Sequence, residues 1–201
     1  LAGAAPQPIT RLTLVDRAAP PVDLTADARV QVVTGDLNEL LTPDAHGTTR
    51  AVPADAQAVV HLAAAVSGEC EADFDLGLRS NLDSTRALLD ALRHRVNHGA
   101  APAKLVFSSS VAVYGPDAAV PMPAVVTDTT LPTPQTSYGI QKHICEHLVA
   151  DYTRKGYIDG RSARLMTVTV RPGRPNGAAS SFFSGIIREP LAGVESVCPV
   201  D

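Results

Sequence analysis

The sequence has no tryptophan, three cysteines and only 4% aromatic residues, and acidic residues outnumber basic ones. The formal net charge is −4, from 17 Lys and Arg against 21 Asp and Glu, so the composition does not indicate nucleic-acid binding. No apolar stretch reaches the roughly 18 residues of a membrane-spanning helix. Cys70, Cys145 and Cys198 are scattered, and neither a Cys-x-x-Cys pair nor a signal peptide is present. We therefore expect a cytoplasmic protein that binds neither nucleic acid nor membrane.

Short runs rich in β-branched residues alternate with helical patterns along the chain. The runs predict strands at 11–16, 29–36, 57–63, 104–107 and 166–171. Because the runs are almost continuously apolar, they indicate a parallel sheet that is covered on both faces. Apolar residues recur at helical spacing between the strands. This alternation predicts an α/β fold of the Rossmann type, a doubly wound parallel sheet.

Tyr138 and Lys142 are four residues apart, in Tyr-Gly-Ile-Gln-Lys, and on a helix they would share a face. Tyrosine titrates near pH ~10, and a neighbouring cation favours its phenolate form. Such a pair suits proton abstraction from an alcohol, although the spacing also occurs on solvated helix faces. A predicted strand that ends in three serines, 108–110, precedes the helix. A serine and the tyrosine could therefore converge on one substrate oxygen.

Asp16 stands at the end of the first predicted strand. An acidic residue at such a position in a dinucleotide-binding sheet accepts hydrogen bonds from ribose hydroxyls and repels a 2′-phosphate. We therefore expect NAD rather than NADP as the cofactor. The neighbouring Arg17 weakens this preference, and a plain surface turn is the alternative for an isolated aspartate.

The Tyr138–Lys142 segment and Phe107-Ser-Ser-Ser-Val-Ala-Val-Tyr-Gly115 together resemble the catalytic core of the extended short-chain dehydrogenase/reductase family. The resemblance implies that Tyr138 is the base. It implies that Lys142 holds the phenolate form and contacts the nicotinamide ribose. Family members use the third serine of the run, so Ser110 is the expected partner of the substrate oxygen and Ser109 is expected to support the cofactor. A plain loop cap is the alternative for these serines.

The same resemblance implies cofactor contacts from successive loops. Asp36 and Leu37 would lie against the adenine, residues 62–64 near the ribose and pyrophosphate, and residues 171–173 near the nicotinamide. Asn81 fits both a cofactor contact and a helix N-cap. The full set of expected cofactor residues is Asp16, Asp36, Leu37, Leu62, Ala63, Ala64, Asn81, Ser109, Tyr138, Lys142, Arg171, Pro172 and Gly173.

Residues 171–190 resemble a bacterial branch of the family that acts on four-carbon sugar acids, and generic sugar-nucleotide epimerases differ there. The implied reaction is NAD-dependent oxidation of the C2 hydroxyl of a small sugar acid. Arginine can bind a carboxylate through two parallel hydrogen bonds, although solvated surface charge is an equal alternative for Arg174 and Arg188. The expected substrate residues are Ser67, Ser110, Tyr138, Arg174, Asn176, Ser180 and Arg188.

The family's glycine-rich pyrophosphate loop has no counterpart in the first ten residues, which contain one glycine. We therefore expect that the first strand and helix of the Rossmann unit are missing from the chain. Residues 1–173 would form an incomplete NAD-binding domain, and residues 174–201 would begin a small substrate-binding portion. Alone, the chain is expected to be poorly stable and to bind NAD weakly.

Several alternatives remain open. His143-Ile-Cys-Glu-His147 matches an inverted zinc-peptidase pattern, but it shares the helix of Tyr138 and lacks a third ligand, so no metal is expected. A nucleotide-sugar 4-epimerase or dehydratase would use the same tyrosine and lysine. A second alternative is a non-catalytic binding protein with the same fold, which would not need to retain Tyr138 and Lys142. Family members commonly pair through the Tyr138-bearing helix, which implies a possible homodimer.

Overall fold

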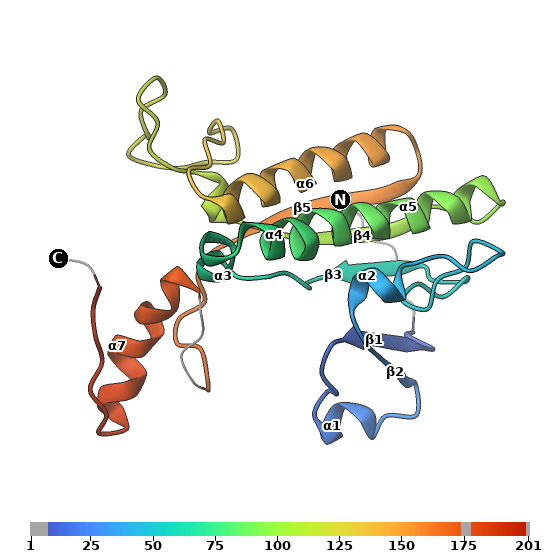
Figure 1. The fold of residues 1–201 in the computed structure, drawn as a ribbon, viewed down its shortest axis with the longest axis horizontal. Helices are drawn as coiled ribbons and strands as arrows, with labels where there is room; N and C mark the ends of the chain where they lie inside the picture. Colours follow the sequence, from blue (N-terminus) through green and yellow to red (C-terminus); the bar gives the residue numbers. More distant parts are fainter. Residues whose placement is uncertain (1–7, 174–177, 200–201) are drawn as a thin grey trace.

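The computed structural model of the protein describes residues 8–173 and 178–199 (Figure 1). Within this part, the strands form two separate parallel sheets. One sheet pairs β1 (Leu12–Asp16) with β2 (Val30–Thr34), and the other has the order β3-β4-β5, from β3 (Ala58–His61), β4 (Ala103–Ser110) and β5 (Ile158–Leu165). The α/β architecture with parallel strands is confirmed.

Helical segments connect the strands. They are α1 (Val22–Thr25), α2 (Leu37–Leu40), α3 (Ser67–Ala72), α4 (Phe74–Gly77), the π-helical η1 (Leu78–Asp83), α5 (Ser84–Asn97), the 3₁₀ turn η2 (Val111–Val113), α6 (Ser137–Arg154), the 3₁₀ turn η3 (Ala179–Ser181) and α7 (Phe182–Leu191). None of them, among the residues that the structure describes, is long and apolar enough to cross a bilayer.

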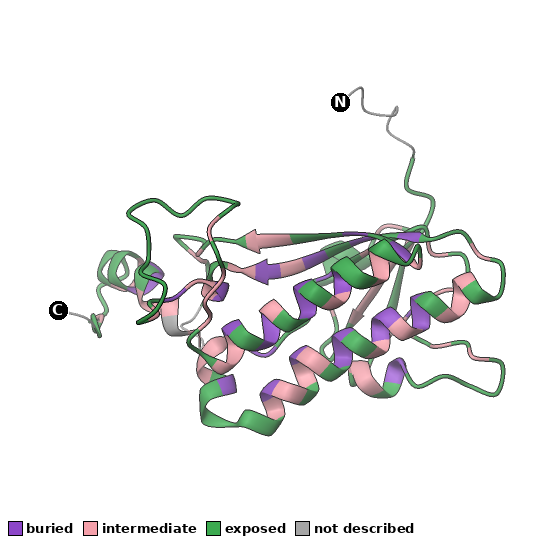
Figure 2. Cartoon of the chain, turned by 90° about the horizontal axis from the view of Figure 1, so that it is seen from above, coloured by how far each residue is buried: buried purple, intermediate pink, exposed green. Residues whose placement is uncertain are grey.

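The hydrophobic core lies between the β3-β4-β5 sheet and the two long helices, α5 and α6. Leu89 from α5, Leu105 and Phe107 from β4 and Cys145 from α6 are almost completely buried in it. Figure 2 shows the two helices on the same side of this sheet. On β4, side chains alternate between the two faces, as the pleat of a strand requires. Alternate residues from Ala103 to Ser109 therefore face the helices.

The opposite face of this sheet is open in the described part of the chain. Val60 is 62% exposed and Val106 is 42% exposed. The expectation that both faces are covered is therefore wrong for these residues. An apolar run shows that a strand can be buried, but the packing of other segments decides whether it is.

The last strand differs from its predicted position. The sequence predicts a strand at 166–171, whereas β5 ends at Leu165 and Met166 beyond it is 78% exposed. The charged residues Arg161 and Arg164 interrupt the apolar pattern of β5. Arg164 stands in this strand because it pairs with Glu146 on α6. This compensation cannot be recognised from the periodicity of the strand alone.

The two sheets are linked by side chains and by a short helix. Arg11 pairs with Asp55 in the segment before β3, and Asn38 on α2 donates to the carbonyl of Arg79 at 3.1 Å. No backbone ladder joins β1 to β3 in the described residues. The pieces are therefore held together chiefly through α2 and its neighbours.

Candidate active site

The N-terminus of α6 lies against the carboxyl end of β4. Thr136 caps the helix and accepts a hydrogen bond from the backbone N–H of Gly139 at 3.1 Å. A Cβ at position 139 would stand 2.2 Å from the carbonyl oxygen of Ala112, so only glycine permits this approach. The close packing sets Tyr138 beside the end of the strand.

Three consecutive residues of β4 interact with three successive turns of α6. Tyr138 lies near enough to Ser110 for the serine hydroxyl to act on the pKa of the phenol, the carbonyl of Ser108 accepts from Lys142 Nζ at 2.7 Å, and Ser109 Oγ donates to Glu146 Oε1 at 2.5 Å. The helix residues lie along one face because they are four positions apart. Ser110, Tyr138 and Lys142 thus lie at the same end of β4, and their convergence on one substrate oxygen remains a prediction.

The Tyr138 phenol is poorly solvated. Burial raises its pKa above the ordinary value of 10.0, while the hydrogen bond with Ser110 and the charge of Arg171 act in the opposite direction. The Tyr–Lys spacing suggested a lowered pKa, so the direction differs from that expectation. Lys142 Nζ lies 5.6 Å from the centre of the Tyr138 ring and 4.8 Å from that of Phe107. It is therefore above the rings and not bonded to the phenol.

Lys142 is a buried cation with little compensation. Lys142 is only 2% exposed, and burial lowers the pKa of its ammonium group from 10.5 to about 8. No carboxylate forms an ion pair with it in the part of the chain that the structure describes. Such an arrangement is typical of a functional site, where a group remains available for a ligand.

Ser109 does not lie where the resemblance implied. Strand alternation turns its side chain toward α6, and it is 3% exposed. Its hydroxyl is bonded to Glu146, which also accepts from Arg164 Nε at 3.0 Å and from Arg164 Nη2 at 2.7 Å. The geometry therefore does not support a direct cofactor contact for Ser109.

Glu146 retains its charge in this position. Burial alone would raise its pKa, but the bonds from Arg164 and Ser109 outweigh that effect and lower the pKa below 4.5. Glu146 and Arg164 were not expected at the site from the sequence. The signal that could have found Glu146 is its spacing, one helical turn beyond Lys142.

Asn81 connects the loop after β3 to α6. It is buried inside η1, so it is not the helix N-cap considered from the sequence. Its Oδ1 accepts from the N–H of Ala65 at 2.8 Å, and its Nδ2 donates to Gln141 Oε1 at 2.8 Å and to Cys70 Sγ at 3.2 Å. Asn81 thereby holds the loop that contains Leu62, Ala63 and Ala64.

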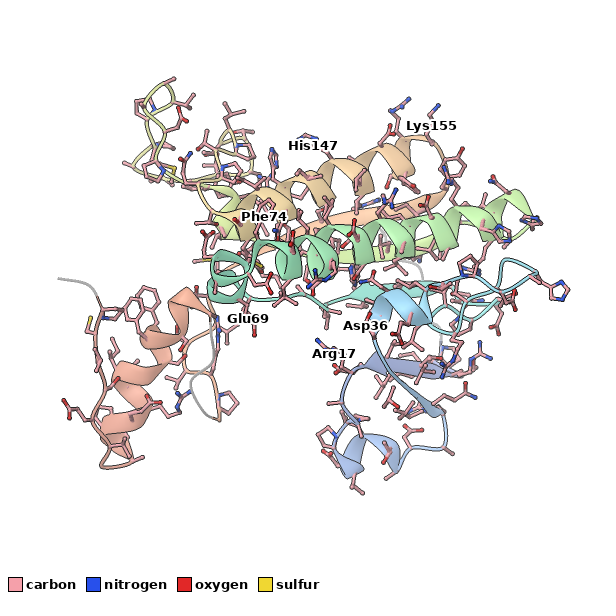
Figure 3. The ribbon with its side chains drawn as sticks, viewed as in Figure 1. Arg17, Asp36, Glu69, Phe74, His147 and Lys155 are labelled. Atoms are coloured by element: carbon pink, nitrogen blue, oxygen red, sulfur yellow. The ribbon has the colours of Figure 1, made fainter. Side chains whose placement is uncertain are left out.

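Other expected cofactor residues lie at the carboxyl ends of the strands. Asp16 is exposed and accepts a hydrogen bond from Ala18 N at 2.9 Å. Leu37 is the first residue of α2, and Asp36 caps this helix by accepting a hydrogen bond from Asn38 N at 2.9 Å. Asp36 and Arg17 are labelled in Figure 3. Leu62 is 65% exposed. The exposed Asp16 carboxylate can accept hydrogen bonds and the buried Lys142 ammonium can donate them. With the exposed loop at Leu62, these groups fit the needs of NAD.

The structure describes only some of the expected substrate residues. Arg174 and Asn176 lie outside the described residues. Ser67 begins α3, and Ser180 accepts from Arg171 Nη2 at 3.4 Å. Arg188 is not a solvated surface charge, because it pairs with Glu189 and donates to the carbonyl of Arg171 at 2.6 Å.

The segment that contains Pro172 and Gly173 is held to α7. Ser184, which the sequence interpretation missed, is buried, and its Oγ accepts from the N–H of Arg171 at 2.9 Å. Together with Arg188, it joins α7 to the residues that follow β5. No pattern in the sequence marks this serine.

The zinc-peptidase pattern does not form a metal cage. Glu146 is directed toward Arg164, His143 Nδ1 stands 3.6 Å from Glu146 Oε2, and His147 Nε2 stands 3.3 Å from His143 Nε2. Within residues 8–173 and 178–199, no three potential ligands are grouped in a way that could hold a metal ion.

The comparisons with known proteins agree with this arrangement. The family described as "NAD dependent epimerase/dehydratase family" matches residues 4–199. The chain is 55% identical over 195 residues to a D-erythronate dehydrogenase of Cupriavidus necator, covering 97% of this chain and 56% of that protein. It is 44% identical over 154 residues to a D-erythronate dehydrogenase of Haemophilus influenzae, covering 77% of this chain and 46% of the relative. The chain thus spans about half the length of these curated relatives.

A solved structure is also similar. A nucleoside-diphosphate-sugar epimerase from Agrobacterium tumefaciens superimposes with a TM-score of 0.82 at 44% identity, covering 97% of this chain and 54% of that one. The two kinds of name, dehydrogenase and epimerase, correspond to the alternatives that remained open from the sequence.

Proposed function

Since the chain belongs to the NAD dependent epimerase/dehydratase family, we propose that it is part of an NAD-dependent dehydrogenase that oxidises the C2 hydroxyl of a small sugar acid. The proposed reaction converts D-erythronate to 2-dehydro-D-erythronate. The observation that carries the proposal is the placement of Tyr138 at the end of β4 near Ser110, with the buried Lys142, which forms no ion pair among the described residues, 5.6 Å from the centre of its ring. Identity of 55% to a D-erythronate dehydrogenase supports the choice of substrate.

Tyr138 is the proposed base. Its phenolic oxygen takes the proton of the substrate hydroxyl, and Ser110 hydrogen-bonds the same substrate oxygen. NAD, when bound, supplies the acceptor for the hydride from the substrate carbon. Lys142 provides a fixed positive charge, which favours the anionic form of Tyr138 when the two approach, and it can donate to a ribose hydroxyl.

The remaining residues have proposed binding roles. Asp16 selects NAD by accepting from the adenosine ribose, and Asp36, Leu37 and the loop at 62–64 line the rest of the dinucleotide site. Arg171, Pro172 and Gly173 would lie near the nicotinamide, and the charge of Arg171 acts on the pKa of Tyr138. Arg174 and Asn176 remain substrate candidates.

The organisation of the whole protein is also proposed. Residues 1–173 would belong to the NAD-binding domain, and residues 174–201 to the substrate-binding portion. Ile140 and Ile144 are exposed on α6, which supports a homodimer that pairs through this helix. The free, buried thiols of Cys70 and Cys145 suit the cytoplasm.

The test is NADH formation by the protein in its complete natural length, with D-erythronate, L-threonate and a UDP-hexose as substrates. We expect steady NADH with one acid, and Tyr138→Phe should lower kcat by about 100-fold or more. Tyr157→Phe, just beyond α6, is the matched control and should retain activity. Conversion of the UDP-hexose without net NADH would replace the proposal with a nucleotide-sugar 4-epimerase, which returns its hydride to the substrate.

A further inference from the structure

An ion pair between a buried glutamate and a half-buried arginine stands next to the proposed catalytic residues. Glu146 follows Lys142 by one turn of α6, and Glu146 is 9% exposed. Arg164 approaches both carboxylate oxygens through Nε and Nη2, at 3.0 and 2.7 Å. A planar, forked pair of this kind restrains orientation as well as distance.

The ion pair also holds the strand that contains Ser110. The Ser109 hydroxyl donates to Glu146 Oε1 at 2.5 Å, and Ser109 is the covalent neighbour of Ser110. The residue before Ser109 is also bonded to α6, because the carbonyl of Ser108 accepts a hydrogen bond from Lys142. Thus the position of Ser110 relative to α6 depends on contacts made by both of its upstream neighbours.

We propose that Glu146 is a positioning residue, which acts through Ser109 to hold the end of β4 at the separation from α6 that lets Ser110 and Tyr138 reach the same substrate oxygen. This inference rests on the proposed function. Misplacement of reacting groups by about 1 Å can lower a rate by about 100-fold, so a second contact that fixes the strand end has a direct consequence for turnover.

Arg164 extends the same restraint to the loop between β4 and α6. Its Nη1 donates to the hydroxyl of Tyr114 at 2.5 Å, and that hydroxyl donates to the carbonyl of Thr127 at 3.4 Å. The chain of contacts from Glu146 through Arg164 and Tyr114 therefore connects the helix to the segment that precedes it. A shift of Glu146 would move the strand end and this loop together.

The sharpest variant is Ser109→Ala, because it removes the contact with the strand and leaves the ion pair between Glu146 and Arg164 intact. In the complete natural protein, kcat should fall about tenfold, while the KM values for NAD and for the acid change less than about twofold. Glu146→Gln keeps an oxygen that can accept from Ser109 but loses the charge that Arg164 orients, so kcat should fall as well. The double variant should be no slower than Ser109→Ala alone, since Glu146 acts on the strand end through the hydroxyl that Ser109→Ala removes.

Asp151→Asn is the matched control, because Asp151 makes an exposed ion pair with Arg154 on the same helix at 2.6 Å. It should leave kcat unchanged. A lower melting temperature with unaltered kcat in Ser109→Ala and Glu146→Gln would overturn the proposal, and so would fully additive losses. If Glu146→Gln does not fold, Ser109→Ala decides alone. Retention of activity by Tyr138→Phe would instead show that the proposed function has failed.

Discussion

Lys142 and Glu146 stand one turn apart on α6, and both are buried, yet their surroundings differ. Glu146 accepts three hydrogen bonds from Arg164 and Ser109 at 3.0 Å or less, and its pKa is lowered in spite of burial. Lys142 donates to a single carbonyl, and burial lowers its pKa to about 8. The comparison teaches that the protein satisfies the charge that holds the fold and leaves unsatisfied the charge that would meet a ligand.

Replacing Lys142 should give the largest effect, because activity should fall while stability rises. Lys142→Met removes the cation that favours the Tyr138 phenolate in the proposed mechanism, so we expect kcat to fall by about 100-fold or more. The same change should stabilise the fold by up to about 3.5 kcal/mol, because the pKa shift from 10.5 to about 8 corresponds to roughly 1.4 kcal/mol per unit. Activity assays and urea denaturation of the same sample measure both effects.

The control for this change is Lys155→Met, at the exposed C-cap of α6 (Figure 3). It should alter neither quantity appreciably, since an exposed lysine has lost little hydration. A Lys142→Met protein that is less stable than the original would contradict the assignment of Lys142 as an uncompensated charge.

Replacing a partner of the satisfied charge should have the opposite effect on stability. Arg164→Met removes the arginine partner of the buried Glu146 and leaves His143 Nδ1, at 3.6 Å, as a weaker partner, and we expect a loss of about 3 kcal/mol near neutral pH. In the original protein, the lowered pKa of Glu146 contributes stability above its ordinary pKa of 4.5 that is lost as the pH falls through the folded value. In the variant, burial should raise the pKa of Glu146.

The stability of Arg164→Met should therefore be highest below the ordinary pKa of Glu146 and fall as the pH rises from there through the raised pKa of Glu146 in the folded variant. Denaturation of both proteins at pH values on either side of this range, with Arg154→Met as the exposed control, measures the difference. A loss that does not depend on pH would mean that Arg164 acts through packing and not through charge.

The last prediction concerns the pH dependence of the Lys142→Met stabilisation. The folded pKa of Lys142 is below its unfolded value, so the charge is present in both states below about 8 and the full penalty applies there. Above 10.5 the group is neutral in both states. The stability advantage of Lys142→Met should thus be largest near neutral pH and fade between about 8 and 10.5.

Denaturation of the two proteins at matched pH values measures this contribution. Burial raises the pKa of Tyr138 in both proteins. The charge of Lys142 lowers the pKa values of Cys70 and Cys145, so the titration of these thiols changes together with that of Lys142. A constant difference between the proteins across this range would exclude titration of Lys142 as its cause.

Local patterns predicted the parts of the site that depend on local structure. The serines at a strand end and the tyrosine and lysine on the following helix were recognisable, because strand and helix periodicity decide which side chains share a face. The position of β5 was missed because Arg161 and Arg164 interrupt its apolar pattern, and only the partner on α6 explains Arg164.

Tertiary contacts decided the rest. The pKa of Tyr138 is raised by burial, which depends on segments distant in the sequence. Ser109 was assigned to the cofactor, whereas strand alternation directs it to Glu146. The low stability and weak NAD binding expected for the isolated chain remain predictions.

The π-helical turn η1 can also be considered as an insertion. Relative to an α-helix, such a turn accommodates one additional residue, and here it separates α4 from α5 and contains Asn81. A deletion of one residue between Leu78 and Asp83 could restore α-helical geometry, and α4 would then rotate by about 100° relative to α5. The bonds from Asn81 to Ala65 and Gln141 would be lost. Chain length in this turn should therefore be more strictly maintained during evolution than the identity of its exposed side chains.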